Sequence, residues 1–164
     1  PSGLRAGFFL GDQTGVGKGR QIAGIIFDNA ARGRMRHIWF STSTDLRQDA
    51  ERDLKDIGCH LTVINGCKQL DQERKGLGLS STVKEGVLFS TYMTLISMVT
   101  RGGPGNAGQS RLDQLIAWCG GDEFDGCIIF DECHKAKNYV PGSETASTKV
   151  SKAVVRIQTL LPKA

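Results

Sequence analysis

The sequence lacks the long apolar run that a membrane-spanning helix requires. No stretch of its 164 residues approaches the roughly 20 consecutive apolar residues that cross a bilayer. The residues after Pro1 also lack the charged and apolar regions of a secretory signal peptide. We therefore expect no membrane partner.

Cysteine and histidine occur without the spacing of a metal site or a disulfide framework. The five cysteines are odd in number and contain no Cys-x-x-Cys pair, and the three histidines are scattered. This pattern predicts the reduced thiols of an intracellular protein. No internal repeat is visible either.

The bulk composition is that of an ordinary globular domain. The chain is 39% hydrophobic and 23% charged, and its length is sufficient to bury one core. The net charge of +4 is a mild basic excess, which is compatible with a nucleic-acid partner without requiring one.

A glycine-rich segment near the start has the layout of a phosphate-binding loop. An apolar run at residues 7–10 predicts a strand, the loop ends in Gly17-Lys18, and residues 21–27 predict a helix. Backbone N–H groups in such a loop and the positive end of the helix dipole bind phosphates, and the lysine ammonium reaches the outer ones. The candidate nucleotide-binding residues are Thr14, Gly15, Val16, Gly17, Lys18, Gly19 and Arg20.

Two positions depart from the standard loop pattern G-x-x-x-x-G-K-[ST]. Asp12 stands where the first glycine is expected, and Gly19 replaces the hydroxyl residue that normally contacts Mg²⁺. A glycine-rich turn with a solvated lysine is the alternative interpretation. The predicted strand before the loop and the predicted helix after it favour the phosphate site.

A second candidate site follows an apolar run at residues 127–130, which predicts a buried strand. Asp131 and Glu132 come directly after it. Asp131 can hold Mg²⁺ through its water shell, and Glu132 can deprotonate an attacking water. Taken alone, two acidic residues after a strand indicate a polar turn; together with Lys18 they indicate a nucleotide site.

Strands and helices are expected to alternate along the rest of the chain. Strands are predicted at 37–40, 60–64 and 86–90, helices at 46–57, 91–99, 111–119 and 150–161, and irregular segments at 65–84, 101–110 and 135–147. Alternation of this kind predicts an α/β fold whose mainly parallel sheet is covered on both faces. Ligands of such sheets bind at the carboxyl edge, where Lys18 and Asp131 are both expected.

The two motifs resemble motifs I and II of the superfamily 2 helicases, through residues 15–18 and 131–134. Further matches at residues 7–26, 39–58, 89–95 and 124–138 resemble the strawberry notch family in particular, including its use of Gly-Lys-Gly-Arg. The resemblance implies a three-layer RecA-like P-loop NTPase domain that binds ATP and Mg²⁺. It also implies that residues 1–164 are a single truncated first motor domain, without the second domain that would supply an arginine to the γ-phosphate.

The resemblance also implies roles for individual residues. Lys18, Asp131, Glu132 and His134 would be catalytic, with the two carboxylates at the metal and His134 linking the nucleotide to a nucleic-acid groove. A buried histidine is the competing interpretation for His134. The helicase pattern further places nucleic-acid contacts in turns after the second and fourth strands, at Ser41, Thr42, Thr91 and Tyr92. These hydroxyls suit phosphate contacts. The alternative is that Ser41, Thr42 and Thr44 only cap the following helix, and the sequence supports capping alone and capping with contact equally.

Two functions follow from these observations. The first is an ATP-driven motor that acts on nucleic acid, with DNA favoured over RNA, or on chromatin. The resemblance to the strawberry notch family implies that such a motor works in the nucleus, with transcription regulators. The second is a nucleotide-gated scaffold that hydrolyses little ATP. Gly19 favours the scaffold, and the Asp131-Glu132 pair favours the motor.

Overall fold

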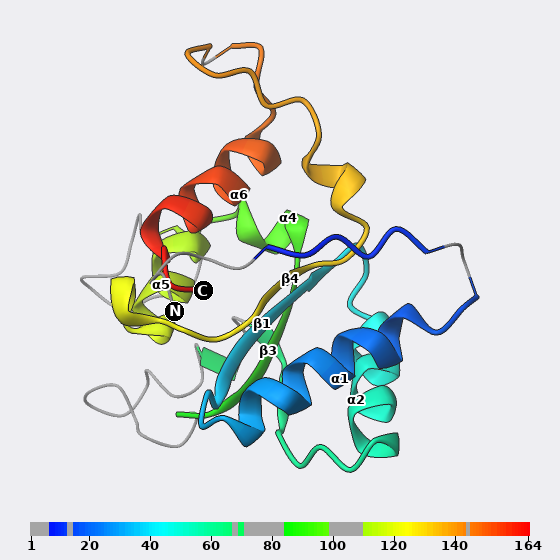
Figure 1. Cartoon of the computed structure of the whole chain (residues 1–164). Helices are drawn as coiled ribbons and strands as arrows, with labels where there is room; N and C mark the ends of the chain where they lie inside the picture. The colour runs from blue at the N-terminus through cyan, green and yellow to red at the C-terminus, as the bar shows by residue number, and fades with distance from the viewer. Residues whose placement is uncertain (1–6, 13–14, 67–68, 71–83, 99–109, 144) are drawn as a thin grey trace.

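A four-stranded parallel sheet runs through the centre of the molecule (Figure 1). The structure is a computed structural model that describes residues 7–12, 15–66, 69–70, 84–98, 110–143 and 145–164. The strands β1 (Arg36–Ser41), β2 (Val63–Ile64), β3 (Gly86–Thr91) and β4 (Ile128–Phe130) lie in the order β2-β3-β1-β4, with every neighbouring pair parallel. The predicted α/β fold with a parallel sheet is confirmed.

Helices cover both faces of the sheet, which gives three layers (Figure 1). Helices α1 (Lys18–Ala31) and α2 (Leu46–Asp56) pack on one face, against Trp39, Val87 and Phe89. On the other face, α4 (Tyr92–Leu95), α5 (Arg111–Cys119) and α6 (Lys149–Leu160) pack against the neighbouring strand residues, among them Phe40 and Leu88. Because successive strand side chains point to opposite faces, continuous apolar strands supply both cores.

The pairing register brings the carboxyl ends of three strands together. Phe40 of β1 lies opposite Phe130 of β4, and Ser41 lies opposite Thr91 of β3. Asp131 therefore emerges beside Ser41, at the edge where parallel sheets bind their ligands.

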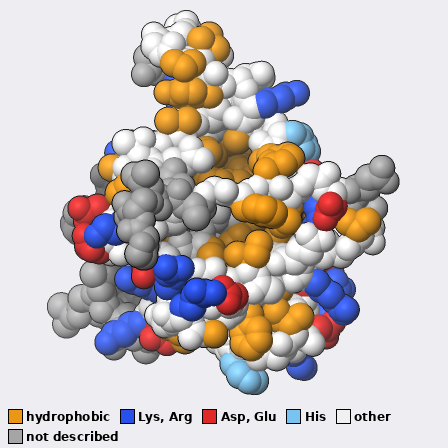
Figure 2. All heavy atoms as spheres, viewed as in Figure 1, with side chains coloured by type: hydrophobic (Ala, Val, Ile, Leu, Met, Phe, Trp, Pro, Cys, Tyr) orange, Lys and Arg blue, Asp and Glu red, His pale blue; other side chains and the backbone are white. Residues whose placement is uncertain are grey.

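The strand predicted at residues 7–10 is absent from the structure. This segment has no regular secondary structure, and of its apolar side chains only Leu10 packs against a core. Phe8 and Phe9 are 83% and 76% exposed, and hydrophobic side chains gather on the face shown in Figure 2. An apolar run forms a strand only where a neighbour satisfies its backbone groups, and β4 pairs only with β1 in the described residues.

Two other elements are shorter than predicted. Strand β2 contains only Val63 and Ile64, because His60 and Thr62 are exposed and only these two residues pair with β3. Helix α4 ends at Leu95, and Met98 forms an isolated bridge with Ser110 instead of continuing it. After Asp131 the chain forms a 3₁₀ helix, η2 (Cys133–Ala136), before the predicted irregular segment.

Some sequence predictions concern residues outside the described ranges. These are Thr14, most of the irregular segment at 65–84 and residues 101–109 of the next one. Among the described helices, none has the length and apolar character to cross a bilayer.

Candidate nucleotide site

The phosphate-binding loop ends at Gly17, the residue before α1 begins. Gly17 has a φ of 81°, a left-handed conformation that favours glycine, and no side chain caps the helix start. The ammonium of Lys18 donates a hydrogen bond to the backbone oxygen of Asp12 at 3.1 Å. The Asp12 carboxylate in turn accepts one from Gln21 at 2.9 Å. Asp12, which departs from the glycine of the standard pattern, thus contacts both Lys18 and α1.

Asp131 is held in place by three hydrogen bonds, two with the end of β1 and one with the first residue of α4. Its backbone N–H donates to Phe40 at 2.9 Å, and its backbone oxygen accepts from the Tyr92 hydroxyl at 2.8 Å. Its carboxylate accepts from the buried Ser41 hydroxyl at 3.0 Å. Burial, followed by the nearby acidic groups, raises the pKa of Tyr92, so the hydroxyl keeps its proton to donate.

Glu132 has a backbone conformation that side chains rarely adopt. Its φ of 53° lies in the left-handed region, which costs a non-glycine residue about 1–3 kcal/mol. This conformation follows directly after β4 and starts η2. The Glu132 carboxylate lies 3.2 Å from Nδ1 of His134. Strain of this kind is typical of functional sites.

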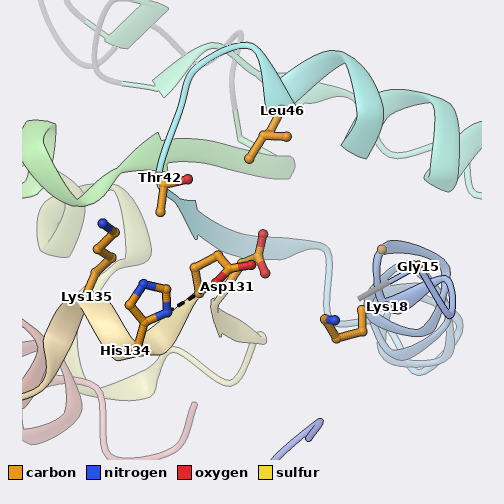
Figure 3. A pocket seen from close by; sticks show the side chains of 9 residues that line it. Gly15, Lys18, Thr42, Leu46, Asp131, His134 and Lys135 are labelled. Atoms are coloured by element: carbon orange, nitrogen blue, oxygen red, sulfur yellow. Dashed lines mark ion pairs between the residues drawn. The ribbon is translucent and has the colours of Figure 1, made fainter. Parts of the chain in front are cut away.

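One cavity of about 490 Å³ contains both halves of the predicted site (Figure 3). Lys18 projects into it from the start of α1, and Asp131 projects from the opposite side, after β4. The connection between β1 and α2 supplies a third wall. The cavity is lined by Gly15, Lys18, Gly19, Thr42, Leu46, Asp131, Glu132, His134 and Lys135.

The donor chemistry of this cavity fits a magnesium nucleotide. A lysine faces two carboxylates, and oxygen ligands of this kind are those that Mg²⁺ prefers. Within the described ranges, no three histidine, cysteine or acidic side chains form a metal-binding group. Mg²⁺ commonly uses one or two carboxylates and completes its shell with water and phosphate oxygens, so the two carboxylates suffice.

Three of the seven predicted nucleotide residues line this cavity. Gly15, Lys18 and Gly19 line it, whereas Arg20 turns away and forms ion pairs with Asp53 and Asp56 of α2. Val16 and Gly17 are exposed but do not line the cavity, and Thr14 lies outside the described residues.

The catalytic candidates Lys18, Asp131, Glu132 and His134 all line the cavity. The His134 side chain is 61% exposed, so the competing interpretation of a buried histidine is wrong. Leu46 and Lys135 also line the cavity and were not predicted to do so. Lys135 was detectable from its place directly after His134, whereas nothing in the sequence marked Leu46.

The hydroxyls predicted to contact nucleic acid are mostly engaged within the protein. Ser41 and Tyr92 are buried and bonded to Asp131, and the buried Thr91 hydroxyl accepts from the backbone of Thr94 to cap α4. Only Thr42 is exposed, at the cavity wall. The capping alternative for Ser41 and Thr42 is wrong, because no side chain caps α2. A nucleic-acid contact through these four residues stays a prediction.

Comparison with known proteins identifies the family of the chain. A family model described as "P-loop containing NTP hydrolase pore-1" matches residues 1–164. Protein strawberry notch homolog 1 from Gallus gallus is 49% identical over 164 residues, which are 100% of this chain and 13% of that protein. Protein FORGETTER 1 from Arabidopsis thaliana is 47% identical over 165 residues, covering 99% of this chain and 12% of its own length.

A third relative, Protein strawberry notch from Drosophila melanogaster, is 46% identical over 164 residues, which are 100% of this chain and 10% of that protein. The chain thus spans only 10% to 13% of the length of these curated relatives. No solved structure matches the chain. The family match covers every residue, and the described fold has the sheet, loop and carboxylates that a P-loop nucleotide site requires. The chain therefore belongs to the P-loop containing NTP hydrolase pore-1 family, as an α/β nucleotide-binding domain similar to that of the strawberry notch proteins.

Proposed function

We propose that this chain binds ATP with Mg²⁺ and hydrolyses it, as the motor domain of a helicase-like protein. One observation carries the proposal: Lys18 and the pair Asp131 and Glu132, which lie more than a hundred positions apart in the sequence, line opposite sides of one cavity. Phosphate binding needs a cation on one side, and hydrolysis needs a proton acceptor on the other.

Each residue has a defined task in this proposal. The loop before α1 and the Lys18 ammonium bind the phosphates, and Asp131, fixed by Ser41 and Tyr92, holds the metal. When bound, Mg²⁺ neutralises charge on the phosphate oxygens. Glu132 accepts the proton of the attacking water, and His134, at 3.2 Å, orients the Glu132 carboxylate.

We further propose that the motor acts on nucleic acid, DNA more than RNA, or on chromatin. Thr42 and Lys135 are exposed at the cavity, and Lys137 and Tyr139, which follow Lys135 in the sequence, are exposed too. Exposed lysines and an exposed aromatic ring suit a phosphate backbone and a stacked base. We also propose that it acts in the nucleus with transcription regulators, as the resemblance to the strawberry notch family implies.

A nucleotide-gated scaffold is the second candidate, and Gly19 favours it. Gly19 lines the cavity where a standard loop supplies a hydroxyl to Mg²⁺. A scaffold would bind ATP and retain it. The motor is the better-supported candidate, because a strained glutamate paired with a histidine suits proton transfer in hydrolysis, which binding alone does not require.

Two variants of the complete protein separate these candidates. Lys18→Ala removes a cation from the phosphates, so nucleotide affinity should fall and turnover should fall with it. Glu132→Gln keeps the size of the side chain but removes the proton acceptor, so ATP should bind normally while hydrolysis slows roughly 10²- to 10⁴-fold. Equilibrium nucleotide binding and single-turnover hydrolysis measure the two effects.

The outcomes distinguish motor from scaffold. If Glu132→Gln hydrolyses ATP as fast as the parent, Glu132 is not the base and the motor proposal fails. If the parent binds ATP but hydrolyses none with DNA, RNA and nucleosomes supplied in turn, the scaffold is correct.

A further inference from the structure

A side chain at position 19 would meet a steric clash and not a strained backbone conformation. Gly19 lies in the first turn of α1 and is absent from the described residues with a positive φ. A β-carbon built at this position would overlap with Oδ2 of Asp53, which projects from α2. Gly19 therefore lacks the hydroxyl of a standard phosphate-binding loop, and the Asp53 carboxylate occupies the space where a side chain at position 19 would lie.

The Asp53 carboxylate is fixed on its other side by arginines. Its Oδ1 lies 3.9 Å from Nε of Arg20 and 3.5 Å from Arg52, and its side chain is only 14% exposed. Arg20 also pairs with Asp56, one turn further along α2. Moving the carboxylate away from Gly19 would weaken these ion pairs. Arg20 thus fastens the first turn of α1 to α2, and Gly19 leaves the space that the Asp53 carboxylate occupies.

This fastening joins two walls of the nucleotide cavity. The first turn of α1 carries Lys18 and Gly19, which line one wall. Helix α2 begins at Leu46, which lines another wall together with Thr42 (Figure 3). A change in the α1–α2 spacing at Gly19 would therefore move the Lys18 wall relative to the Leu46 wall.

We propose that Asp53 is a positioning residue for the phosphate-binding loop, and that Gly19 and Arg20 are its two contacts on α1. The proposal rests on the proposed binding of a magnesium nucleotide and deepens it. The glycine at position 19 then makes room for Asp53, in addition to removing the hydroxyl that would contact the metal. Restoring a side chain at position 19 alone disturbs the loop, and Arg20 acts on α2 instead of on the phosphates.

The test is a double-mutant cycle with a matched glycine control in the same helix. Gly19→Ala adds one methyl group against Asp53, whereas Gly24→Ala adds the same group to α1 at an exposed position with nothing within 4 Å. Asp53→Ala empties the space, and Asp53→Asn keeps the shape but removes the charge. The dissociation constant of a fluorescent Mg·ATP analogue is measured for the complete protein, with thermal unfolding recorded for each variant.

Gly19→Ala should weaken nucleotide binding about tenfold, the equivalent of ~1.4 kcal/mol, while Gly24→Ala stays close to the parent. In the Asp53→Ala background, Gly19→Ala should cause no further loss. In the Asp53→Asn background it should still weaken binding, because the side chain still fills the space. Thermal unfolding separates positioning from a loss of stability, because a variant that binds nucleotide weakly but unfolds at the temperature of the parent has lost positioning alone.

Two results would overturn the proposal. Normal nucleotide binding by Gly19→Ala would show that the space is not needed, and an equal loss in the Asp53→Ala background would show that the two positions act independently. A parent protein that binds no nucleotide would instead refute the proposed function, and the positioning role with it. The unfolding temperatures of the single and double variants would still show whether Gly19 and Asp53 are in contact, because substitutions at independent positions shift the unfolding temperature additively.

Discussion

At the scale of single residues, the site depends on how Asp131 is held. Ser41 and Tyr92 both donate hydrogen bonds to it, and both are buried, so its orientation is fixed before any ligand arrives. Glu132 follows in a strained conformation with His134 beside it. Pre-organisation of this kind places a metal-binding carboxylate and a proton acceptor next to each other at no further cost when the ligand binds.

His37 is a buried residue that should make the fold sensitive to acid. Its Nδ1 accepts a hydrogen bond from the backbone of Cys127 at 3.0 Å, and burial lowers the pKa of His37 from 6.5 to about 4. Between pH 6.5 and pH 4, His37 is protonated in the unfolded chain but stays neutral in the folded chain. Stability should therefore be fully present above pH 6.5 and decline towards pH 4, by at most about 3 kcal/mol.

Denaturant unfolding at a series of pH values measures this effect. His37→Asn should flatten the decline between pH 6.5 and pH 4, even if it lowers stability overall. The exposed His60 provides the control, because His60→Asn should leave the slope unchanged. A His37→Asn variant with the slope of the parent would contradict the assignment.

At the scale of elements, the turns after β1 and β3 have different tasks. The turn after β3 starts α4, which Thr91 caps through a 3.2 Å hydrogen bond from the backbone of Thr94. The turn after β1 leads to α2, which has no side-chain cap, and it leaves Thr42 exposed at the cavity. Thr91, the last residue of β3, is therefore buried, whereas Thr42, the first residue after β1, is exposed.

This difference predicts opposite results for two threonine variants. Thr91→Ala removes a buried cap and should lower stability by about 1 kcal/mol. Thr42→Ala removes an exposed hydroxyl, so it should leave stability nearly unchanged and weaken nucleic-acid binding similarly on all sequences. Denaturant unfolding and binding titrations at two salt concentrations measure both. Equal losses of stability for the two variants would argue against this division.

At the scale of the whole molecule, the described domain encloses the nucleotide site incompletely. Lys18 and the carboxylates form facing walls, but His134 and Lys135 are exposed, and the Glu132 side chain is about half exposed. Charge developing on the transferred phosphate is stabilised mainly by groups that surround it. The curated relatives are much longer than this chain, so additional parts are available in such proteins to complete a site.

Under the proposed ATPase function, a protein with the length of these relatives should therefore hydrolyse ATP far faster than residues 1–164 alone. An arginine supplied to the γ-phosphate is worth roughly 10³–10⁵ in rate, so the isolated chain should bind Mg·ATP weakly and turn over almost none. Steady-state phosphate release by both forms measures the ratio, and Glu132→Gln in each form reports contaminating activity. Robust turnover by residues 1–164 alone would refute this expectation.

The sequence by itself determined the layers and the location of the two motifs. Apolar strands alternating with amphipathic helices define an α/β fold, and α5 forms over the predicted residues 111–119 because its capping and periodicity are local. The sequence also predicted that Lys18 and Asp131 lie at one site, as they do. Asp131 is there because it follows a parallel strand, whereas Lys18 reaches the cavity from the start of α1 without the strand predicted before it.

Only the tertiary structure decided which polar groups serve the site and which serve the fold. Ser41 lies 90 positions before Asp131, yet its hydroxyl donates a hydrogen bond to the Asp131 carboxylate. The Asp53 carboxylate likewise occupies the space where a side chain at position 19 would lie. The strand predicted at residues 7–10 is likewise absent, since pairing depends on a partner and not on apolar character alone. Such contacts depend on packing between distant segments, which local sequence patterns do not specify.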